Sequence, residues 1–186
     1  RLRVVFQNIS NYITLFIGIL FAAIIVIFSL MFGPLIDDYS KLVGKSIIAN
    51  YQYVLKAPAD TKVSGAEKYC VESLKTLQGK YMEDEVTIYG VSDNSKYINA
   101  DIPDGKVYVS NGYMDKFGIK DGDKIELKDT YSNKKYKFEV AGSYKYDAVI
   151  SVFMNRDTFI KTFDKDNDYY SGYFSNKKLK DIDDGY

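Results

Sequence analysis

Few residues in this sequence have the types and spacing that catalysis requires. The 186-residue chain contains no histidine, which removes the commonest general base, the commonest zinc ligand and serine or cysteine triads in their usual form. Cys70 is the only cysteine, and without a histidine to activate it core packing is favoured over a nucleophilic role. Asp121, Asp123 and Glu126 surround a tight turn, and no pattern brings two of these carboxylates into a cleft. We therefore predict no catalytic residue and a chain that is not an enzyme.

Two short motifs come close to known ligand-binding loops. Gly44-Lys45-Ser46 matches the end of a phosphate-binding loop, but Tyr39 stands where the first glycine of that motif is required. Asp164-Lys-Asp166-Asn-Asp168 has the alternating carboxylates that open a calcium loop. Tyr169 replaces the glycine of its sharp turn, however, and Ser175 replaces its closing glutamate. We predict neither a cofactor-binding nor a metal-binding residue.

An uncharged segment near the N-terminus has the length and composition of a membrane span. No residue from Val4 to Ile36 is charged, and this stretch exceeds the roughly 20 residues that cross a hydrocarbon core as a helix. A secretory signal peptide would have a shorter apolar core and a small-residue cleavage site, for which Phe32-Gly33-Pro34-Leu35 is a poor match. A buried core helix of this kind would need a much larger protein around it. The sequence therefore predicts a membrane helix within residues 1–38, with lipid as its surroundings.

Charges on either side of this segment predict its orientation. Arg1 and Arg3 precede it, whereas Asp37 and Asp38 follow it directly, so the N-terminus is expected in the cytoplasm, although two lysines soon afterwards reduce the contrast. Residues 39–186 are then extracytoplasmic and have the usual size of one domain. The 25 basic and 25 acidic residues of the chain balance, which argues against nucleic acid as a partner. Because the sequence begins without methionine and ends abruptly, we expect it to be part of a longer protein.

The remaining patterns predict an α+β domain with mixed strands and helices. A helical extension is expected over 39–45, and a loop over 93–105 with a turn at Pro103-Asp104-Gly105. Turn and cap signals divide the rest. Helices are predicted over 66–77 with Ser64 as its cap, over 111–117 capped by Ser110, over 156–163 capped by Asn155, and from 177 to 182. Strands are predicted over 47–56, 85–91, 106–109, up to Leu127 after the turn at Asp121-Gly122, over 136–141 as its hairpin partner, over 148–154 in a central position, and over 169–174.

Three stretches carry a resemblance to a known family. Phe6-Gln7-Asn8-Ile9 begins the predicted membrane helix, and the strand Asn50-Tyr-Gln-Tyr-Val-Leu-Lys56 lies just outside it. The third stretch runs from Val107 to Leu127 and places Gly118-Ile-Lys-Asp-Gly-Asp123 between a short helix and a strand. Together they resemble the FtsX-like/MacB-type permease subunits of ABC transporters, in which an extracytoplasmic α/β domain is inserted between two membrane helices.

The resemblance implies a fold of the MacB-like periplasmic core type and a role in the bacterial plasma membrane. It implies a permease, multi-pass at full length, that works with a separate cytoplasmic ABC ATPase to export or release peptides, lipids or lipoproteins, and it allows for a second permease copy. It transfers no catalytic residue to this chain. A single-pass sensor or ligand-binding module is the alternative from another class, and a membrane-tethered hydrolase would need convergent ionisable groups that the sequence does not show.

Overall fold

The computed structural model describes residues 8–56, 63–77, 83–132, 134–147 and 149–179. The chain divides into two compact units, Arg1–Gly44 and Lys45–Tyr186. The described part of the first unit is one long helix, and that of the second contains a mixed sheet with two short helices. The predicted class, an N-terminal apolar helix followed by an α+β domain, is confirmed.

Helix α2, Ile9–Lys45, is the only helix among the described residues that is long and apolar enough to cross a membrane. Its 37 residues correspond to about 55 Å, which is longer than a hydrocarbon core of about 30 Å. The helix continues past Asp37 to Lys45, as the sequence predicts. All of its described side chains are exposed, and an apolar surface of this size is unfavourable in water. Pro34 interrupts the helical hydrogen bonds because it has no N–H to donate to the carbonyl of Leu30.

Eight strands form one mixed sheet in the described part of the second unit. They are β1 Tyr51–Val54, β2 Glu67–Thr76, β3 Glu85–Val91, β4 Val107–Ser110, β5 Lys124–Asp129, β6 Lys135–Tyr144, β7 Ser151–Asn155 and β8 Gly172–Ser175. The order is β1-β8-β2-β3-β7-β4-β6-β5, and β2 also pairs with β5. Six strands, β2-β3-β7-β4-β6-β5, therefore close into a ring, from which β8 and β1 extend. The pairs β3–β7 and β4–β6 are parallel, and all others are antiparallel.

Strand β2 corrects the helix predicted over 66–77. Cys70 and Leu74 lie four residues apart, a spacing that suits one face of a helix and one face of a strand equally well. In the structure both side chains are buried in one core cluster, whereas Tyr69 and Val71 face a second cluster on the other side of the strand. Because core residues cover both faces of this segment, a strand, whose side chains alternate between two faces, buries more of them than a helix would. Ser64 caps no helix.

The other predicted elements agree with the structure to different extents. The strand over 85–91 is confirmed at both ends, as are α3, Asn111–Phe117, capped by Ser110, and α4, Arg156–Phe163, capped by Asn155. The β5–β6 hairpin is confirmed, and β7 is central between β3 and β4. Three strands are shorter than predicted, 51–54 for 47–56, 151–155 for 148–154 and 172–175 for 169–174. Residues 177–179 are not helical, and the rest of the helix predicted over 177–182 lies outside the described residues.

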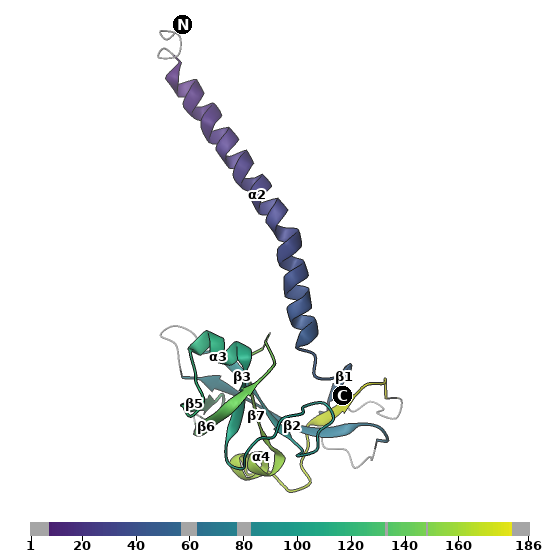
Figure 1. Ribbon diagram of the computed structural model, residues 1–186. Helices are drawn as coiled ribbons and strands as arrows, with labels where there is room; N and C mark the ends of the chain where they lie inside the picture. The colour runs from purple at the N-terminus through teal and green to yellow at the C-terminus, as the bar shows by residue number, and fades with distance from the viewer. Residues whose placement is uncertain (1–7, 57–62, 78–82, 133, 148, 180–186) are drawn as a thin grey trace. The chain divides into compact units, whose positions relative to one another are not determined.

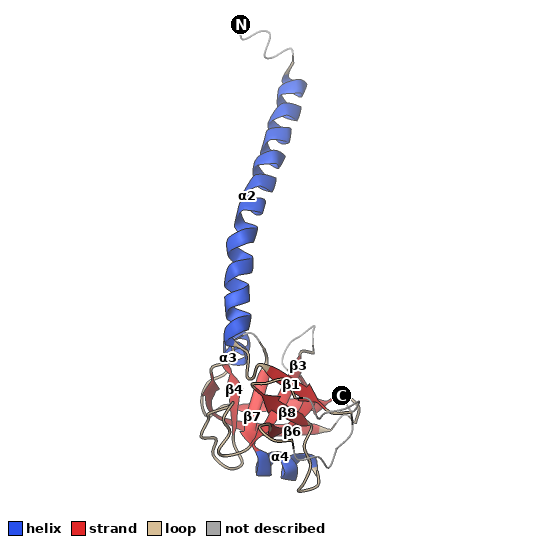
Figure 2. Cartoon of the chain, turned by 90° about the vertical axis from the view of Figure 1, so that its right-hand side faces the viewer, coloured by secondary structure: helices blue, strands red, loops and turns tan. Residues whose placement is uncertain are grey.

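Two core clusters fill the domain. The larger one lies inside the ring and is mostly aliphatic, with Phe159 of α4 and Tyr113 of α3 among its buried aromatic residues. The second is aromatic and includes Tyr69, Tyr89, Phe153 and Phe174, whose rings lie 4.1–6.4 Å apart, a range in which aromatic pairs attract. Helices α3 and α4 lie at opposite ends of the strands (Figures 1 and 2).

Ser110 joins three elements through one hydroxyl group. Its Oγ donates to the carbonyl of Val149 at 2.7 Å and accepts from the N–H of Tyr113 at 3.2 Å and of Ser151 at 3.1 Å. These bonds connect the end of β4, the first turn of α3 and the start of β7. The Ser151 hydroxyl itself is fully buried and has no hydrogen-bond partner among the described residues.

The two buried serines should therefore respond differently to alanine. Ser110→Ala is expected to lower the free energy of unfolding by about 1–3 kcal/mol, because it removes a helix cap and leaves a buried N–H unpaired. Ser151→Ala should leave the free energy of unfolding unchanged or raise it by up to about 1 kcal/mol, because it removes an unpaired hydroxyl. Urea unfolding of both variants measures the difference. Equal losses in the free energy of unfolding would show that the hydrogen bonds of Ser110 do not stabilise the domain.

Candidate functional site

The residues that the sequence singled out for chemistry lie apart in the structure. Asp164 ends helix α4 in the left-handed region, with φ of 51°, and the carbonyl of Asp166 accepts from the N–H of Tyr169. Among the described residues, no group of three acidic or cysteine side chains is arranged to hold a metal ion. These geometries belong to an ordinary turn, and the absence of a bound metal stays a prediction.

Cys70 is buried in the larger core cluster, in agreement with the packing role that the sequence favours. Its thiol donates to the carbonyl of Tyr169 at 3.3 Å, and a guanidinium nitrogen of Arg156 donates to the same carbonyl at 3.2 Å. Burial raises the pKa of the Cys70 thiol above its ordinary value, and the nearby Arg156 offsets this only in part. A protonated, buried thiol is a poor nucleophile, so the contacts support a packing role.

The five residues Ser46–Asn50 connect α2 to β1, and three of them are buried or half-buried. Ser46 is buried, and Ile48 and Ala49 contact the aromatic cluster. Strand β1 then pairs with β8 from Tyr51 to Val54, and the N–H of Leu55 donates to the carbonyl of Ser171 at 2.9 Å. The chain is therefore fixed to the domain within a few residues of the end of the helix.

A close backbone contact holds β1 in place. Gly172 of β8 lies so near β1 that a Cβ atom there would be 1.8 Å from the carbonyl oxygen of Tyr53. The Tyr69 ring lies over the same glycine, and its hydroxyl donates to the Tyr53 carbonyl at 3.2 Å. Burial raises the pKa of Tyr69 to about 12, so this hydroxyl keeps its proton at neutral pH. The amide of Gln52 also donates to the Tyr69 hydroxyl, at 3.2 Å, which completes a small polar contact between β1 and β2.

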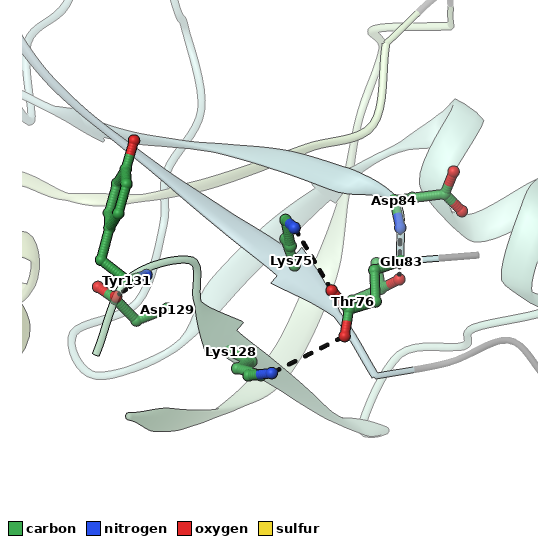
Figure 3. Close-up of polar contacts among 7 residues, drawn as sticks. All are labelled: Lys75, Thr76, Glu83, Asp84, Lys128, Asp129 and Tyr131. Atoms are coloured by element: carbon green, nitrogen blue, oxygen red, sulfur yellow. Dashed lines mark hydrogen bonds and ion pairs between the residues drawn. The ribbon is translucent and has the colours of Figure 1, made fainter. Parts of the chain in front are cut away.

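The ring of strands closes at a short seam between β2 and β5. Only three residue pairs form it, and one of them places Lys75 directly opposite Lys128. Two like charges in this position repel, but the Glu83 carboxylate lies 3.4 Å from the Lys75 ammonium and 3.8 Å from that of Lys128 (Figure 3). All three side chains are partly exposed, so each pair contributes at most about 1 kcal/mol, and added salt weakens it.

Asp84 and Asp129 fix the chain on either side of this seam. The backbone N–H of Thr76 donates to the carbonyl of Asp84 at 2.9 Å, and the Asp84 N–H donates back to the Thr76 hydroxyl at 3.2 Å. The Asp129 carboxylate accepts from the N–H groups of Tyr131 and Ser132, and these bonds hold the pKa of Asp129 below its ordinary value. The Tyr131 side chain is 95% exposed and points away from the cluster (Figure 3).

Comparisons with known proteins find a structural likeness but no match by sequence. No protein-family model matches the sequence, and no curated protein matches it. One similar solved structure is the extracellular domain of the noncanonic ABC-type transporter YknZ from Gram-positive bacteria. The two chains are 14% identical, the match covers 65% of this chain and 67% of the other, and the TM-score is 0.40. At this identity and TM-score, the likeness does not assign a function to the chain.

Proposed function

We propose that this chain belongs to the permease subunit of an ABC transporter of the FtsX-like/MacB type, in the bacterial plasma membrane. Helix α2 crosses the membrane, and the domain that begins at Lys45 lies outside the cytoplasm. The sequence stretches at Phe6–Ile9 and Val107–Leu127 support the family, and the long apolar helix supports the location. The observation that carries the mechanism is the short, packed link between the helix and β1.

Mechanical transmission depends on how stiff this link is. A flexible Gly/Ser-rich linker behaves as a random coil and absorbs the movement of one end before it reaches the other. Here five residues separate Lys45 from Tyr51, and Ile48 and Ala49 among them pack into the domain. Movement of the outer end of α2 is therefore passed to β1, and through its hydrogen bonds to β8 and β2.

In this role the chain itself performs no covalent chemistry. A separate cytoplasmic ATPase hydrolyses ATP, and further membrane helices of the full-length permease, together with a second permease copy, complete the assembly. The outer domain couples the resulting motion to export or release of a peptide, lipid or lipoprotein. The domain suits this role because six of its eight described strands close into a ring, and closure leaves few free strand edges.

Purification of the full-length protein from membranes in mild detergent tests this proposal. We expect an ABC ATPase subunit to co-purify in a fixed ratio, with ATP hydrolysis that a Walker A lysine substitution in that ATPase abolishes. Recovery of a cytoplasmic kinase or response domain instead, on the same polypeptide or as a stable partner, would favour the sensor alternative. Failure of any ATPase to co-purify at native expression levels would contradict the permease assignment.

A further inference from the structure

A groove on the outer domain is formed by three segments that are distant in the sequence. One part, about 310 Å³, lies among the residues Ser64, Gly65, Lys96, Tyr97, Ser175, Asn176, Lys177 and Leu179. An adjoining part of about 280 Å³ is lined by Gly65, Ala66, Glu67, Lys96 and Tyr97. Both parts are lined by Gly65, Lys96 and Tyr97, so they lie next to each other, and together they are called the groove. Its volume is large enough for a few side chains of an extended segment.

Tyr97 gives the groove a fixed aromatic wall. Its ring lies 5.6 Å from that of Phe174 in the aromatic cluster, and its N–H donates to the Ser95 hydroxyl at 3.2 Å. Its carbonyl accepts from the Tyr144 hydroxyl at 3.4 Å. Tyr97 is only half-buried, so part of the residue remains exposed to a ligand. The two hydrogen bonds fix the backbone of Tyr97, and the contact with Phe174 orders its ring, so the ring binds an apolar side chain at low entropic cost.

Two lysines supply the charge of the groove. Lys96 and Lys177 are exposed, and in the described part of the chain neither ammonium group forms an ion pair or a hydrogen bond. By contrast, four of the six lysines on the ring strands are paired with carboxylates, as Lys135 and Lys137 are with Glu126. Glu67 is the only carboxylate that lines the groove, and it accepts from the backbone N–H of Lys96 at 2.9 Å. The lining therefore has two ammonium groups and one carboxylate, an excess of one positive charge among the described residues.

From this charge and shape, we infer that the groove beside Tyr97 binds an extended acidic peptide segment, with carboxylates at Lys96 and Lys177 and an apolar side chain against Tyr97. Complementary charge gives such a contact its specificity, and the ring gives it apolar area. The inference goes beyond the proposed transport role, because it concerns what the outer domain contacts and needs no ATPase.

Fluorescence anisotropy of a rhodamine-labelled Glu-Leu-Glu-Leu peptide tests the inference on the full chain in nanodiscs of neutral lipid. The variant K96Q/K177Q removes both charges of the groove, and K120Q/K145Q is its matched control. Lys120 and Lys145 are also exposed, without a described ion pair, and line neither part of the groove. We expect Kd to rise about 10-fold in K96Q/K177Q and to stay within about 2-fold in the control. A Gln-Leu-Gln-Leu peptide should bind the unmodified chain at least about 10-fold more weakly.

Several results would overturn the inference. They are no saturable binding of the acidic peptide to the unmodified chain, an equal loss in both double variants, and equal binding of the neutral peptide. Groove-dependent binding of vesicles that contain anionic lipid, without binding of the peptide, would identify a lipid headgroup as the ligand and also overturn it. Since the assay contains neither ATP nor an ATPase, each of these results leaves the co-purification test unaffected.

Discussion

Insertion of about ten Gly/Ser residues between Lys45 and Ser46 is expected to abolish transport while ATP hydrolysis by the assembly continues. The inserted coil would lie between the end of α2 and the packed residues Ile48 and Ala49, so movement of the helix would no longer reach β1. The insertion point lies one residue after the boundary between the two compact units. Transport and ATPase activity are measured on the same membranes. A resistance phenotype that depends on transport can be measured on cells instead.

The matched control carries the same insertion between Tyr131 and Ser132, at the exposed end of the β5–β6 hairpin. This site lies far from the link in sequence, and loop ends tolerate insertions well. We expect near-normal transport from the control. Unchanged transport with the insertion at Lys45 would show that the link does not transmit movement, and loss of transport in both variants would indicate a general defect of the outer domain.

Gly172→Ala is expected to lower the free energy of unfolding of the outer domain by about 3 kcal/mol. The added methyl group would lie 1.8 Å from the carbonyl oxygen of Tyr53, a backbone atom that can move only if β1 separates from β8. The Tyr69 ring would also lie close to the added methyl group, at 3.0 Å. Urea unfolding, followed by circular dichroism, gives the change in the free energy of unfolding.

Gly142→Ala is the control, since Gly142 also lies within a strand. Its added Cβ would first meet the Tyr108 ring at 3.2 Å, and this half-buried side chain can shift by a few tenths of an ångström. We expect a change within about 1 kcal/mol, because alanine also reduces the entropy of the unfolded chain. A similar loss from both substitutions would mean that the β1–β8 contact is not as close as described.

Local signals account for the elements that the sequence predicts well. The uncharged stretch before Asp37 predicts α2 from length and composition alone, and Ser110 with Gly118 defines both ends of α3. The strand over 85–91 follows from its β-branched residues and flanking polar residues. In each case the deciding residues lie within the element or next to it.

The helix predicted over 66–77 shows where local signals fail. The spacing of Cys70 and Leu74 is shared by both periodicities, and only the two core clusters on opposite sides of β2 decide between them. The β2–β5 seam, with Glu83 between Lys75 and Lys128, joins residues that are distant in sequence and leave no local pattern. Gly172 gives a weak signal, because a glycine within a strand can mark a close backbone approach.

The groove could not be predicted for the same reason. Its residues come from the segment before β2, the loop after β3 and the end of β8, which only the sheet order brings together. From the sequence, Lys96 and Lys177 are ordinary surface lysines, and their missing carboxylate partners become evident only when the ion pairs of the domain are known.

Cysteine labelling on intact cells tests the central claim, that α2 crosses the membrane with the following domain outside. Tyr131→Cys places a thiol at a position that is 95% exposed, whereas Cys70 is buried and the unmodified protein serves as the unlabelled control. We predict that a membrane-impermeant maleimide labels Tyr131→Cys before lysis, that Leu2→Cys is labelled only after permeabilisation, and that both variants remain in the membrane fraction. Labelling of Tyr131→Cys only after lysis, or recovery of the full-length protein in the soluble fraction, would contradict the account.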